Sequence, residues 1–301
     1  MKFIITADWH LRSDKPRCRI DSDWIRTQKD AIAFVYSKAT QYQANVCIVG
    51  DIFHRPNDNI YVLYMFLSAI LNSLVHTGVL AGNHDLLYNS FEYVNRSQYG
   101  IIQSVMTTTD KLNPLVIWGK SYNYGQPFSA YKDAKWEIVF LHELTFKTER
   151  EAPPGSKYYL AQDLLDMFPD AKWIFTGDNH HNFVYEKNHR YVINPGCLLR
   201  QAADMKDYQP VIYYVDTVTE EIEKIPVPDD MSMVTDEYLT EEKERDERIT
   251  AFVQSIKKKG KISLSFRDNL EKRMERKQVE KGAKEIIFEC FKEVQYGNTR
   301  I

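Results

Sequence analysis

Aspartate, asparagine and histidine side chains recur directly after short apolar runs in the first two thirds of the chain. The residues are Asp8, His10, Asp51, Asn83, His84, His142, Asp178 and His180. Six of the eight histidines lie in or beside these positions. Nitrogen and oxygen donors without thiolates suit Mn²⁺, Fe²⁺ or Zn²⁺. Two such ions roughly 3.5–4 Å apart can clamp a phosphate and activate a water. The series therefore indicates hydrolysis of a phosphate ester on two divalent metal ions that share one carboxylate.

Each position taken singly also has a purely structural interpretation. An Asp-x-His after a strand is more often a turn with a hydrogen-bonded histidine than a metal site. Asp51 could end an ordinary strand, Asn83 could be a turn residue, and His142 could be a core histidine. It is the ordered repetition of such positions that favours a metal site.

The apolar runs have the length and the β-branched and aromatic content of strands. They span residues 3–7, 46–49, 79–81, 115–118, 138–141, 173–176, 191–193 and 211–215. Amphipathic segments of helix length, residues 23–42 and 59–74, separate the first three runs. This alternation predicts a layered α/β fold in which helices cover the faces of β-sheets. Ligand residues then belong at the carboxyl ends of strands, where the polar residues stand.

Six motifs in this order resemble those of calcineurin-like metallophosphoesterases. They are DWHLR at 8–12, GDIFHR at 50–55, GNHD at 82–85, LHE at 141–143, GDNHH at 177–181 and NPG at 194–196. DWHL followed by GDIFH and AGNHD is similar to the SbcD nuclease branch of that superfamily. The resemblance covers about residues 1–217 and implies a metallophosphoesterase fold, with β-sheets sandwiched by helices.

The resemblance also implies a ligand set. Asp8, His10 and His180 would bind one ion, Asp51 would bridge both, and Asn83 with His142 would bind the second. The family shows Gly-His-x-His where this chain has Gly177-Asp178-Asn179-His180. An aspartate therefore replaces one histidine ligand, with His181 as an alternative donor. Because a carboxylate favours a harder ion, we expect Mn²⁺, with Mg²⁺ or Fe²⁺ as alternatives.

Further roles are implied on the phosphate side of the ions. His84 would stabilise the transition state and protonate the leaving oxygen, with Asp85 orienting it. His54 would lie beside the phosphate, unless it only begins a helix. Arg12 and Arg55 are candidate phosphate contacts or, equally, surface ion-pair residues. The Asn194-Pro195-Gly196 turn lies near the metal centre in the family, and Arg200 beyond it is a candidate contact to DNA.

Charge is distributed unevenly near the C-terminus. Residues 220–248 carry twelve acidic and four basic side chains, whereas residues 257–301 carry thirteen basic and seven acidic ones. We place a domain boundary near residue 225, followed by a mainly helical appendage over residues 226–301. By resemblance this appendage would contact DNA and dock, through residues 263–295, on an SMC-like ABC ATPase of the SbcC type. Packing of these helices on the chain's own catalytic domain is the alternative.

Cysteine spacing and the N-terminus bear on the compartment. Cys18, Cys47, Cys197 and Cys290 are far apart, which argues against a disulfide framework or a thiolate zinc site. The segment MKFIITAD resembles neither a signal peptide nor a membrane span. We therefore expect a cytoplasmic protein without membrane contact.

The resemblance to the SbcD branch implies a DNA exonuclease and endonuclease that acts as a homodimer, through residues 59–74, in an SbcCD-like recombination and repair complex. Two alternatives remain. One is a stand-alone phosphoesterase acting on nucleotides or phosphoproteins, and the other is an assembly subunit without activity.

Overall fold

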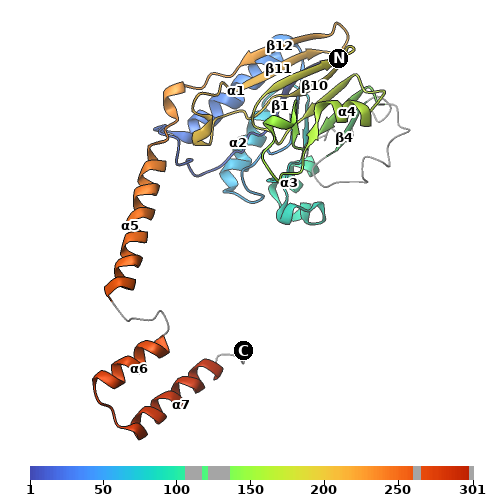
Figure 1. Ribbon diagram of the computed structural model, residues 1–301. Helices are drawn as coiled ribbons and strands as arrows, with labels where there is room; N and C mark the ends of the chain where they lie inside the picture. Colours follow the sequence, from blue (N-terminus) through green and yellow to red (C-terminus); the bar gives the residue numbers. More distant parts are fainter. Residues whose placement is uncertain (106–116, 121–135, 260–265, 298–301) are drawn as a thin grey trace. The chain divides into compact units, whose positions relative to one another are not determined.

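The computed structural model describes residues 1–105, 117–120, 136–259 and 266–297. They form two compact units, Met1–Asp236 and Glu237–Ile301. The first unit contains two five-stranded sheets and the second is helical (Figure 1). The predicted α/β class with a helical appendage is confirmed.

The first sheet has the strand order β12-β11-β1-β2-β3. Its strands are β1 (Lys2–Thr6), β2 (Asn45–Val49), β3 (Thr77–Leu80), β11 (Val211–Asp216) and β12 (Glu221–Pro226). β1, β2 and β3 run parallel, whereas β11 and β12 are antiparallel to their neighbours. The carboxyl ends of β1, β2 and β3 consequently meet at one edge of the sheet.

The second sheet has the order β4-β5-β8-β10-β9. Its strands are β4 (Ile117–Lys120), β5 (Ile138–Leu141), β8 (Trp173–Thr176), β10 (Arg190–Asn194) and β9 (Phe183–Lys187). β4, β5, β8 and β10 are parallel and β9 is antiparallel. A two-stranded ladder of β6 (Thr145–Phe146) and β7 (Tyr159–Leu160) follows β5.

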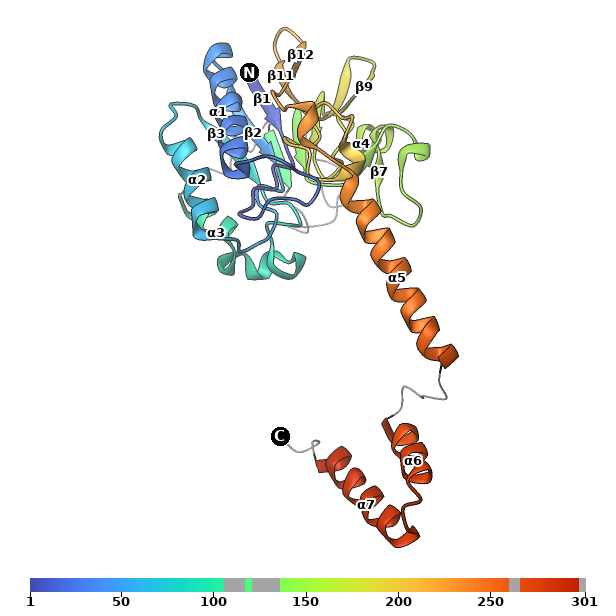
Figure 2. The same cartoon turned by 90° about the vertical axis from the view of Figure 1, so that its left-hand side faces the viewer.

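Helices cover the outer faces of both sheets (Figure 2). In the described residues of this unit they are α1 (Trp24–Tyr42), α2 (Ile60–Leu71), α3 (Gln98–Val105) and α4 (Ala161–Met167). α1 begins where the Asp23 carboxylate accepts a hydrogen bond from the Arg26 N–H, and it ends at Gln43 in a left-handed conformation. α1, α2 and α3 pack on the first sheet, and α4 packs on the second.

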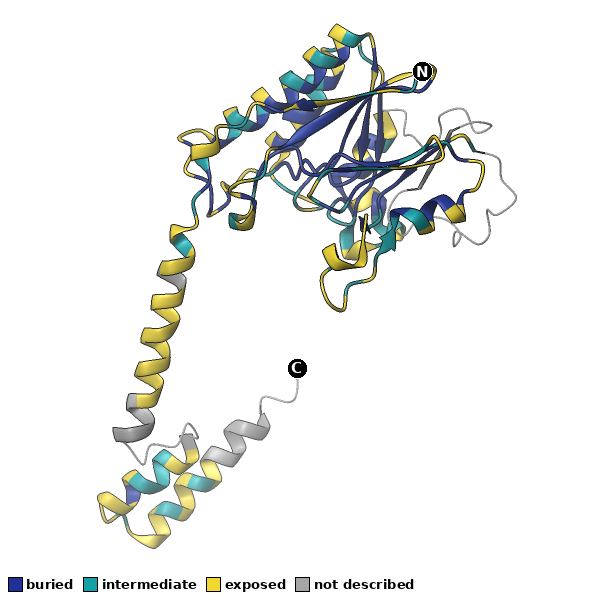
Figure 3. Ribbon diagram, turned by 45° about the horizontal axis from the view of Figure 1, so that its top comes forward, coloured by how far each residue is buried: buried dark blue, intermediate teal, exposed yellow. Residues whose placement is uncertain are grey.

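The two sheets pack face to face and enclose an aromatic core. Phe3 of β1 contacts Phe140 of β5 edge-on, with ring centroids 6.1 Å apart, and Phe140 stacks on Phe175 at 5.0 Å. Each fully buried ring of this kind contributes about 1.5–3 kcal/mol of hydrophobic stabilisation. Figure 3 shows the strands of this core as buried on both faces. The four layers fix the relative position of the strand ends.

Short 3₁₀ helices complete the loops. They are η1 (Leu87–Asn89), η2 (Phe91–Arg96), η5 (Glu149–Glu151), η6 (Ala203–Met205) and η7 (Met231–Met233).

Some element bounds differ from the predicted ones. The helix predicted to reach Leu74 ends at Leu71, and residues 115 and 116 of the fourth predicted strand lie outside the described residues. The edge strands β9 and β12 were not predicted, because half-polar edge strands lack a continuous apolar run. The first unit extends to Asp236, beyond the boundary predicted near residue 225, since Val227 and Val234 are buried in it.

The second unit contains α5 (Glu237–Lys259), α6 (Phe266–Arg276) and α7 (Lys281–Gly297). The Arg267 guanidinium lies 5.6 Å from the centroid of the Phe288 ring, and Met274 is buried. On α7, Ile286 is 63% exposed and Ile287 is 37% exposed. This unit therefore presents apolar side chains that its own described residues leave uncovered.

Candidate metal centre

Loops that follow five parallel strands bring the predicted ligands together. The loop after β1 carries Asp8 and His10, the loop after β2 carries Asp51, and the loop after β3 carries Asn83. The loop after β5 carries His142, and the loop after β8 carries Asp178 and His180. Three groups of side chains have ligand atoms within 4.8 Å of one another: Asp8–His10–His180, Asp8–Asp51–His142 and His10–His54–His84. The predicted ligands from both sheets thus converge on one site.

Four of these residues have left-handed backbone conformations. The φ angles are 49° at Asp8, 45° at His10, 52° at Asp51 and 72° at Asp178. Such conformations cost on the order of 1–3 kcal/mol each outside glycine, and they persist where the surrounding structure enforces them for function. In each loop they turn the chain sharply just after a strand.

Two glycines let the loops approach the ligands closely. A Cβ atom at Gly50, whose φ is +86°, would collide with the His142 ring. A Cβ atom at Gly82 would collide with the Asp51 carboxylate. The glycines of the GDIFHR and GNHD motifs are therefore required by packing against ligand side chains.

Asp51 lies at the middle of the site. Its Oδ2 atom is 3.6 Å from His10 Nε2 and 3.5 Å from His142 Nε2, while Oδ1 accepts a hydrogen bond from the His84 N–H at 2.9 Å. Burial would raise the pKa of Asp51, but the charges of His142 and His10 hold it well below its usual range. An ionised carboxylate between two imidazoles is suited to bridging two cations.

The first candidate ion group contains buried polar atoms that need a partner. His10 Nε2 and His180 Nε2 are 3.1 Å apart, and burial lowers the pKa of His10 well below its usual value. Asp8 Oδ1 accepts from the Asp178 N–H, whereas Asp8 Oδ2 has no hydrogen-bond partner among the described residues. Buried acceptors are normally paired. A cation at this point would satisfy them.

The second candidate ion group surrounds His142 Nε2. The other ring nitrogen, Nδ1, donates to the Val49 carbonyl at 2.7 Å, which leaves Nε2 as the ligand atom. Asn83 Oδ1 is 3.3 Å from Nε2. Burial would lower the pKa of His142, but the carboxylates of Asp51, Asp8 and Asp178 raise it well above its usual value. The same three carboxylates favour a positive charge beside this nitrogen, as a bound cation would supply.

Asp178 lies on the side of the second group. Its Oδ1 atom is 4.0 Å from His142 Nε2, and its side chain is 25% exposed. The alternative donor His181 is exposed and packs its ring against Tyr208, with centroids 5.1 Å apart. The geometry favours Asp178 over His181. Two divalent ions would bring a charge of +4, and the ionised carboxylates of Asp8, Asp51 and Asp178 have a total charge of −3. With neutral histidines the centre would therefore have a net charge of +1, which would attract a phosphate.

We expect Asp178→Ala to weaken the binding of one of two Mn²⁺ ions by at least about 10- to 100-fold. Losing even an outer partner of a ligand has an effect of that size. Calorimetric titration of the metal-free protein would measure both sites. His181→Ala should bind both ions like the wild type. If His181→Ala weakened the second ion and Asp178→Ala did not, the ligand assignment would be reversed.

His54 and His84 lie beside these groups. Their rings are stacked with centroids 5.6 Å apart, and the His84 ring meets the His10 ring edge-on at 4.7 Å. His84 Nδ1 donates to the His54 carbonyl at 2.8 Å. Burial, together with the charges of Arg12 and His84, lowers the pKa of His54 to about 4. Two half-buried imidazoles thus border the ligands on the side open to solvent.

The prediction that Asp85 orients His84 is wrong. Asp85 is fully buried and accepts hydrogen bonds from the N–H groups of Ile52, Phe53 and Gly82, at 3.1, 2.8 and 2.9 Å. Burial and the Asp51 charge raise its pKa to about 7. Asp85 therefore ties the loop after β2 to the loop after β3, and the His54 carbonyl orients His84 instead.

Arg12 and Arg55 share one counterion at the rim of the site. Both guanidinium groups pair with Asp14, Arg55 at 3.2 Å. The Arg55 side chain is 53% exposed and that of Arg12 13%. Arg55 is accessible to a substrate phosphate, whereas Arg12 would first have to leave its carboxylate.

The prediction that Arg200 contacts DNA is wrong. Arg200 is completely buried. Its Nε donates to Asp229 at 2.8 Å, and its other nitrogens donate to the carbonyls of Lys206 and Asp230, both at 2.7 Å. Arg19 donates to Asp229 at 3.0 Å as well. Arg200 therefore fastens the segment before α5 to the rest of the first unit.

Asp229→Ala should lower the free energy of unfolding by about 3–5 kcal/mol, because Arg19 and Arg200 would remain buried without their shared carboxylate. Denaturant unfolding measures the change. Asp30→Ala is the control, because it removes only an exposed partner of Arg26. It should lower the free energy of unfolding by about 0.2–1 kcal/mol. Equal effects of the two substitutions would contradict this role of Asp229.

Asn194 has a role that the sequence did not reveal. It is completely buried, and its Nδ2 donates to the carbonyls of Asn179 and His181 at 2.6 and 2.8 Å. Its Oδ1 accepts from the Thr176 hydroxyl at 3.3 Å. Asn194 therefore holds the loop of Asp178 and His180 in place. Its position in the NPG motif was the available signal, although Pro195 and Gly196 alone would explain a tight turn.

Comparison with known families identifies the class. A profile of the family described as Calcineurin-like phosphoesterase matches residues 1–182, a span that contains every proposed cation ligand. The chain belongs to this family. With the ligand groups described above, it is a metal-dependent phosphoesterase of the metallophosphoesterase fold.

Among solved structures, one similar chain is an archaeal phosphodiesterase, with 16% identity, a TM-score of 0.40, and coverage of 75% of this chain and 99% of that one. Another is a candidate 5′-nucleotidase from Staphylococcus aureus in complex with alpha-ketoglutarate, with 16% identity, a TM-score of 0.46, and coverage of 78% and 56%. No curated protein sequence matches the chain. In the described part of the chain, no helix combines the length and apolar character needed to cross a membrane.

Proposed function

We propose that the protein is a DNA nuclease that hydrolyses phosphodiester bonds with two divalent ions, Mn²⁺ above all. The observation that carries the proposal is the His54–His84 pair, stacked at 5.6 Å beside the cation ligands. A phosphodiester in DNA has a poor alkoxide leaving group, which needs a proton as it departs. The pair comes from the GDIFHR and GNHD motifs, whose resemblance is to the SbcD branch.

Bound ions would polarise the phosphate and lower the pKa of an attacking water. The remaining work falls to side chains of this protein. Asp51 holds both ligand groups at one spacing, and Asp85 keeps the loops of Asp51 and His84 together. Since the Nδ1–H of His84 is bonded to the His54 carbonyl, Nε2 is the atom that exchanges a proton with the leaving oxygen.

A nuclease assay on linear duplex DNA with Mn²⁺ tests the proposal. Wild type should release nucleotides or fragments, and chelation should stop the reaction. Bis(p-nitrophenyl) phosphate provides a small diester for comparison. Turnover of the small ester without any DNA cleavage would show a stand-alone phosphoesterase. Turnover of neither substrate would leave an assembly subunit without activity.

We also propose that the nuclease acts as a homodimer through α2. Apolar side chains on this helix are exposed: Ile60 by 72%, Tyr61 by 41%, Tyr64 by 61% and Leu71 by 70%. Tyr64→Glu should shift the protein to a monomer in analytical ultracentrifugation. Ser37→Glu, on α1, should leave the oligomeric state unchanged. A wild-type monomer at micromolar concentration would rule this surface out as a stable interface.

The C-terminal unit is proposed to dock on an SMC-like ABC ATPase of the SbcC type. The exposed Ile286 and Ile287 lie on α7, within residues 257–301, which carry thirteen basic and seven acidic side chains; this combination suits an acidic coiled-coil surface. Combining Ile286→Asp with Ile287→Asp should abolish co-purification with such an ATPase while leaving turnover of the small ester intact. Undiminished co-purification would show that α7 is not the docking helix.

A further inference from the structure

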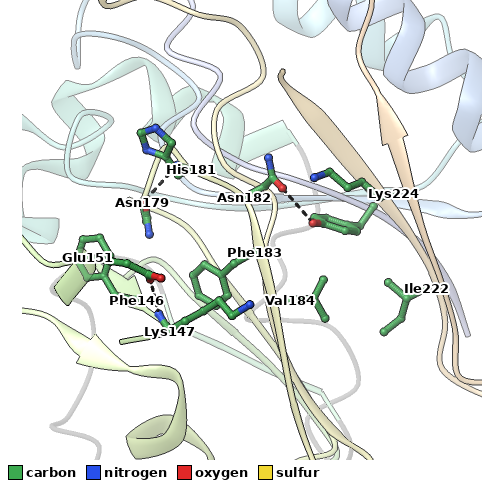
Figure 4. Close-up of a pocket in the computed structure, with 11 residues that line it drawn as sticks. Phe146, Lys147, Glu151, Asn179, His181, Asn182, Phe183, Val184, Ile222 and Lys224 are labelled. Atoms are coloured by element: carbon green, nitrogen blue, oxygen red, sulfur yellow. Dashed lines mark hydrogen bonds between the residues drawn. The ribbon is translucent and has the colours of Figure 1, made fainter. Parts of the chain in front are cut away.

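A cavity of about 750 Å³ lies at the edge strand β9, between the segment after β5 and the strands β11 and β12 (Figure 4). Its walls are Phe146, Lys147, Glu151, Asn179, His181, Asn182, Phe183, Val184, Tyr213, Ile222 and Lys224. They come from the segment after β5, from the loop between β8 and β9 with β9 itself, and from β11 and β12. The volume lies within the ~300–1,000 Å³ usual for small-molecule sites.

The walls place the cavity next to the catalytic ligands. Asn179 and His181 are the chain neighbours of His180. On the opposite wall, Lys224 pairs with Tyr213, and Tyr213 pairs with Ile5 near the carboxyl end of β1. The cavity is therefore level with the strand ends that carry the ligands, at the open side between the edge strands β9 and β12.

The lining combines cations with an apolar floor. Phe146 and Phe183 are buried, with 7% and 8% of their surfaces exposed, and Val184 and Ile222 are half-buried. Lys147 and Lys224 are exposed on separate walls, against one carboxylate at Glu151. A ligand that matches this lining has a flat apolar part and more than one negative charge.

Polar groups in the walls are engaged by the protein itself. Asn182 Nδ2 donates to the Tyr208 hydroxyl at 2.8 Å, and its Oδ1 accepts from the Tyr213 hydroxyl at 3.3 Å. Asn179 Nδ2 donates to the Thr145 carbonyl at 2.8 Å. These hydrogen bonds stiffen the walls. Because the amides are already bonded to the protein, they are not free to bond to a base and so to distinguish one base from another. A nucleotide would be bound here with little preference for its base.

We propose that this cavity binds one nucleotide of the DNA strand next to the bond being cleaved. The base would occupy the apolar floor, and Lys147 and Lys224 would neutralise the flanking phosphates. This proposal rests on the proposed nuclease function and specifies where the strand continues beyond the metal centre. Binding through stacking and phosphate charge without base readout is typical of single-strand sites.

The test measures the affinity of a single-stranded oligonucleotide in Ca²⁺, in a His84→Ala background that prevents cleavage. Combining Lys147→Ala with Lys224→Ala should weaken binding about 10-fold or more at low salt. In a plot of the logarithm of the association constant against the logarithm of the salt concentration, the slope should become shallower by about 0.7 for each lysine that neutralises a phosphate. The matched control combines Lys2→Ala and Lys38→Ala, lysines near the opposite ends of the strands, and should retain both affinity and slope.

An oligonucleotide with abasic sites separates base binding from charge alone. Wild type should bind it at least about 10-fold more weakly than the normal oligonucleotide. Equal affinity for both, or unchanged affinity and slope in the Lys147/Lys224 variant, would overturn the proposal. If wild type cleaved no DNA yet bound the oligonucleotide through these lysines, the nuclease proposal would fail and the cavity assignment would stand.

Discussion

Asp51→Asn will reduce phosphodiesterase turnover by roughly 10³- to 10⁴-fold. Asp51 Oδ2 lies within 3.6 Å of ligand nitrogens in both candidate ion groups, so the substitution weakens both at once. The ions contribute several kcal/mol to the barrier, and each 1.36 kcal/mol is a factor of ten in rate. The measurement is kcat/KM for bis(p-nitrophenyl) phosphate at saturating Mn²⁺.

The same substitution should also lower the stability of the metal-free protein at neutral pH. Asparagine keeps an oxygen that can accept from the His84 N–H, but it removes a carboxylate whose pKa is depressed in the folded protein by its interaction with His142, and that interaction stabilises the fold. We therefore expect a lower melting temperature without metal, and loss of the increase that Mn²⁺ produces in wild type. Asp30→Asn on the exposed face of α1 serves as the control. A variant with wild-type turnover and metal-dependent stabilisation would show that Asp51 is not the bridging ligand.

His84→Ala will lower kcat by about 10²- to 10⁴-fold on DNA, the range for loss of a general acid. Its effect on bis(p-nitrophenyl) phosphate should be much smaller, because p-nitrophenolate leaves without protonation. The two ions should bind with wild-type stoichiometry, since the side chain is assigned to the substrate and not to the metal. Single-turnover cleavage and metal titration measure these quantities separately.

Two further variants make the His84 prediction specific. His54→Ala keeps the backbone carbonyl that holds the His84 ring, so it should lower kcat on DNA by less than His84→Ala does. His189→Ala, whose side chain is 82% exposed, should behave as wild type. Equal loss on both substrates, or loss of one bound ion in His84→Ala, would assign His84 to a metal in the His10–His54–His84 group instead.

The uneven success of prediction has a physical cause. Asp8, Asp51 and His142 lie within two residues of the ends of parallel strands, and local apolar runs reveal where such strands end. Arg200 belongs to no such pattern. It follows the NPG motif in the chain, yet it is buried against Asp229, a partner that only the folded segment before α5 supplies. Proximity in sequence to a site motif did not predict the direction of its side chain.

Asp85 illustrates the same limit within a motif. Its partners Ile52 and Phe53 lie more than thirty residues earlier in the chain, so its hydrogen bonds exist only after β2 and β3 have paired. Asn194 likewise reaches back to the carbonyls of Asn179 and His181 across the β9–β10 hairpin. Buried hydrogen bonds of this kind are properties of the assembled loops.

The sequence by itself determined the class of fold, and it gave the donor types and the order of the candidate cation ligands, because strand periodicity and residue chemistry are local. Only the tertiary structure decided which atoms face one another: Asp51 between His10 and His142, Asp178 beside His142, and His84 on the His54 carbonyl. These contacts join loops of two sheets across a buried aromatic core, and their geometry depends on how the whole unit packs.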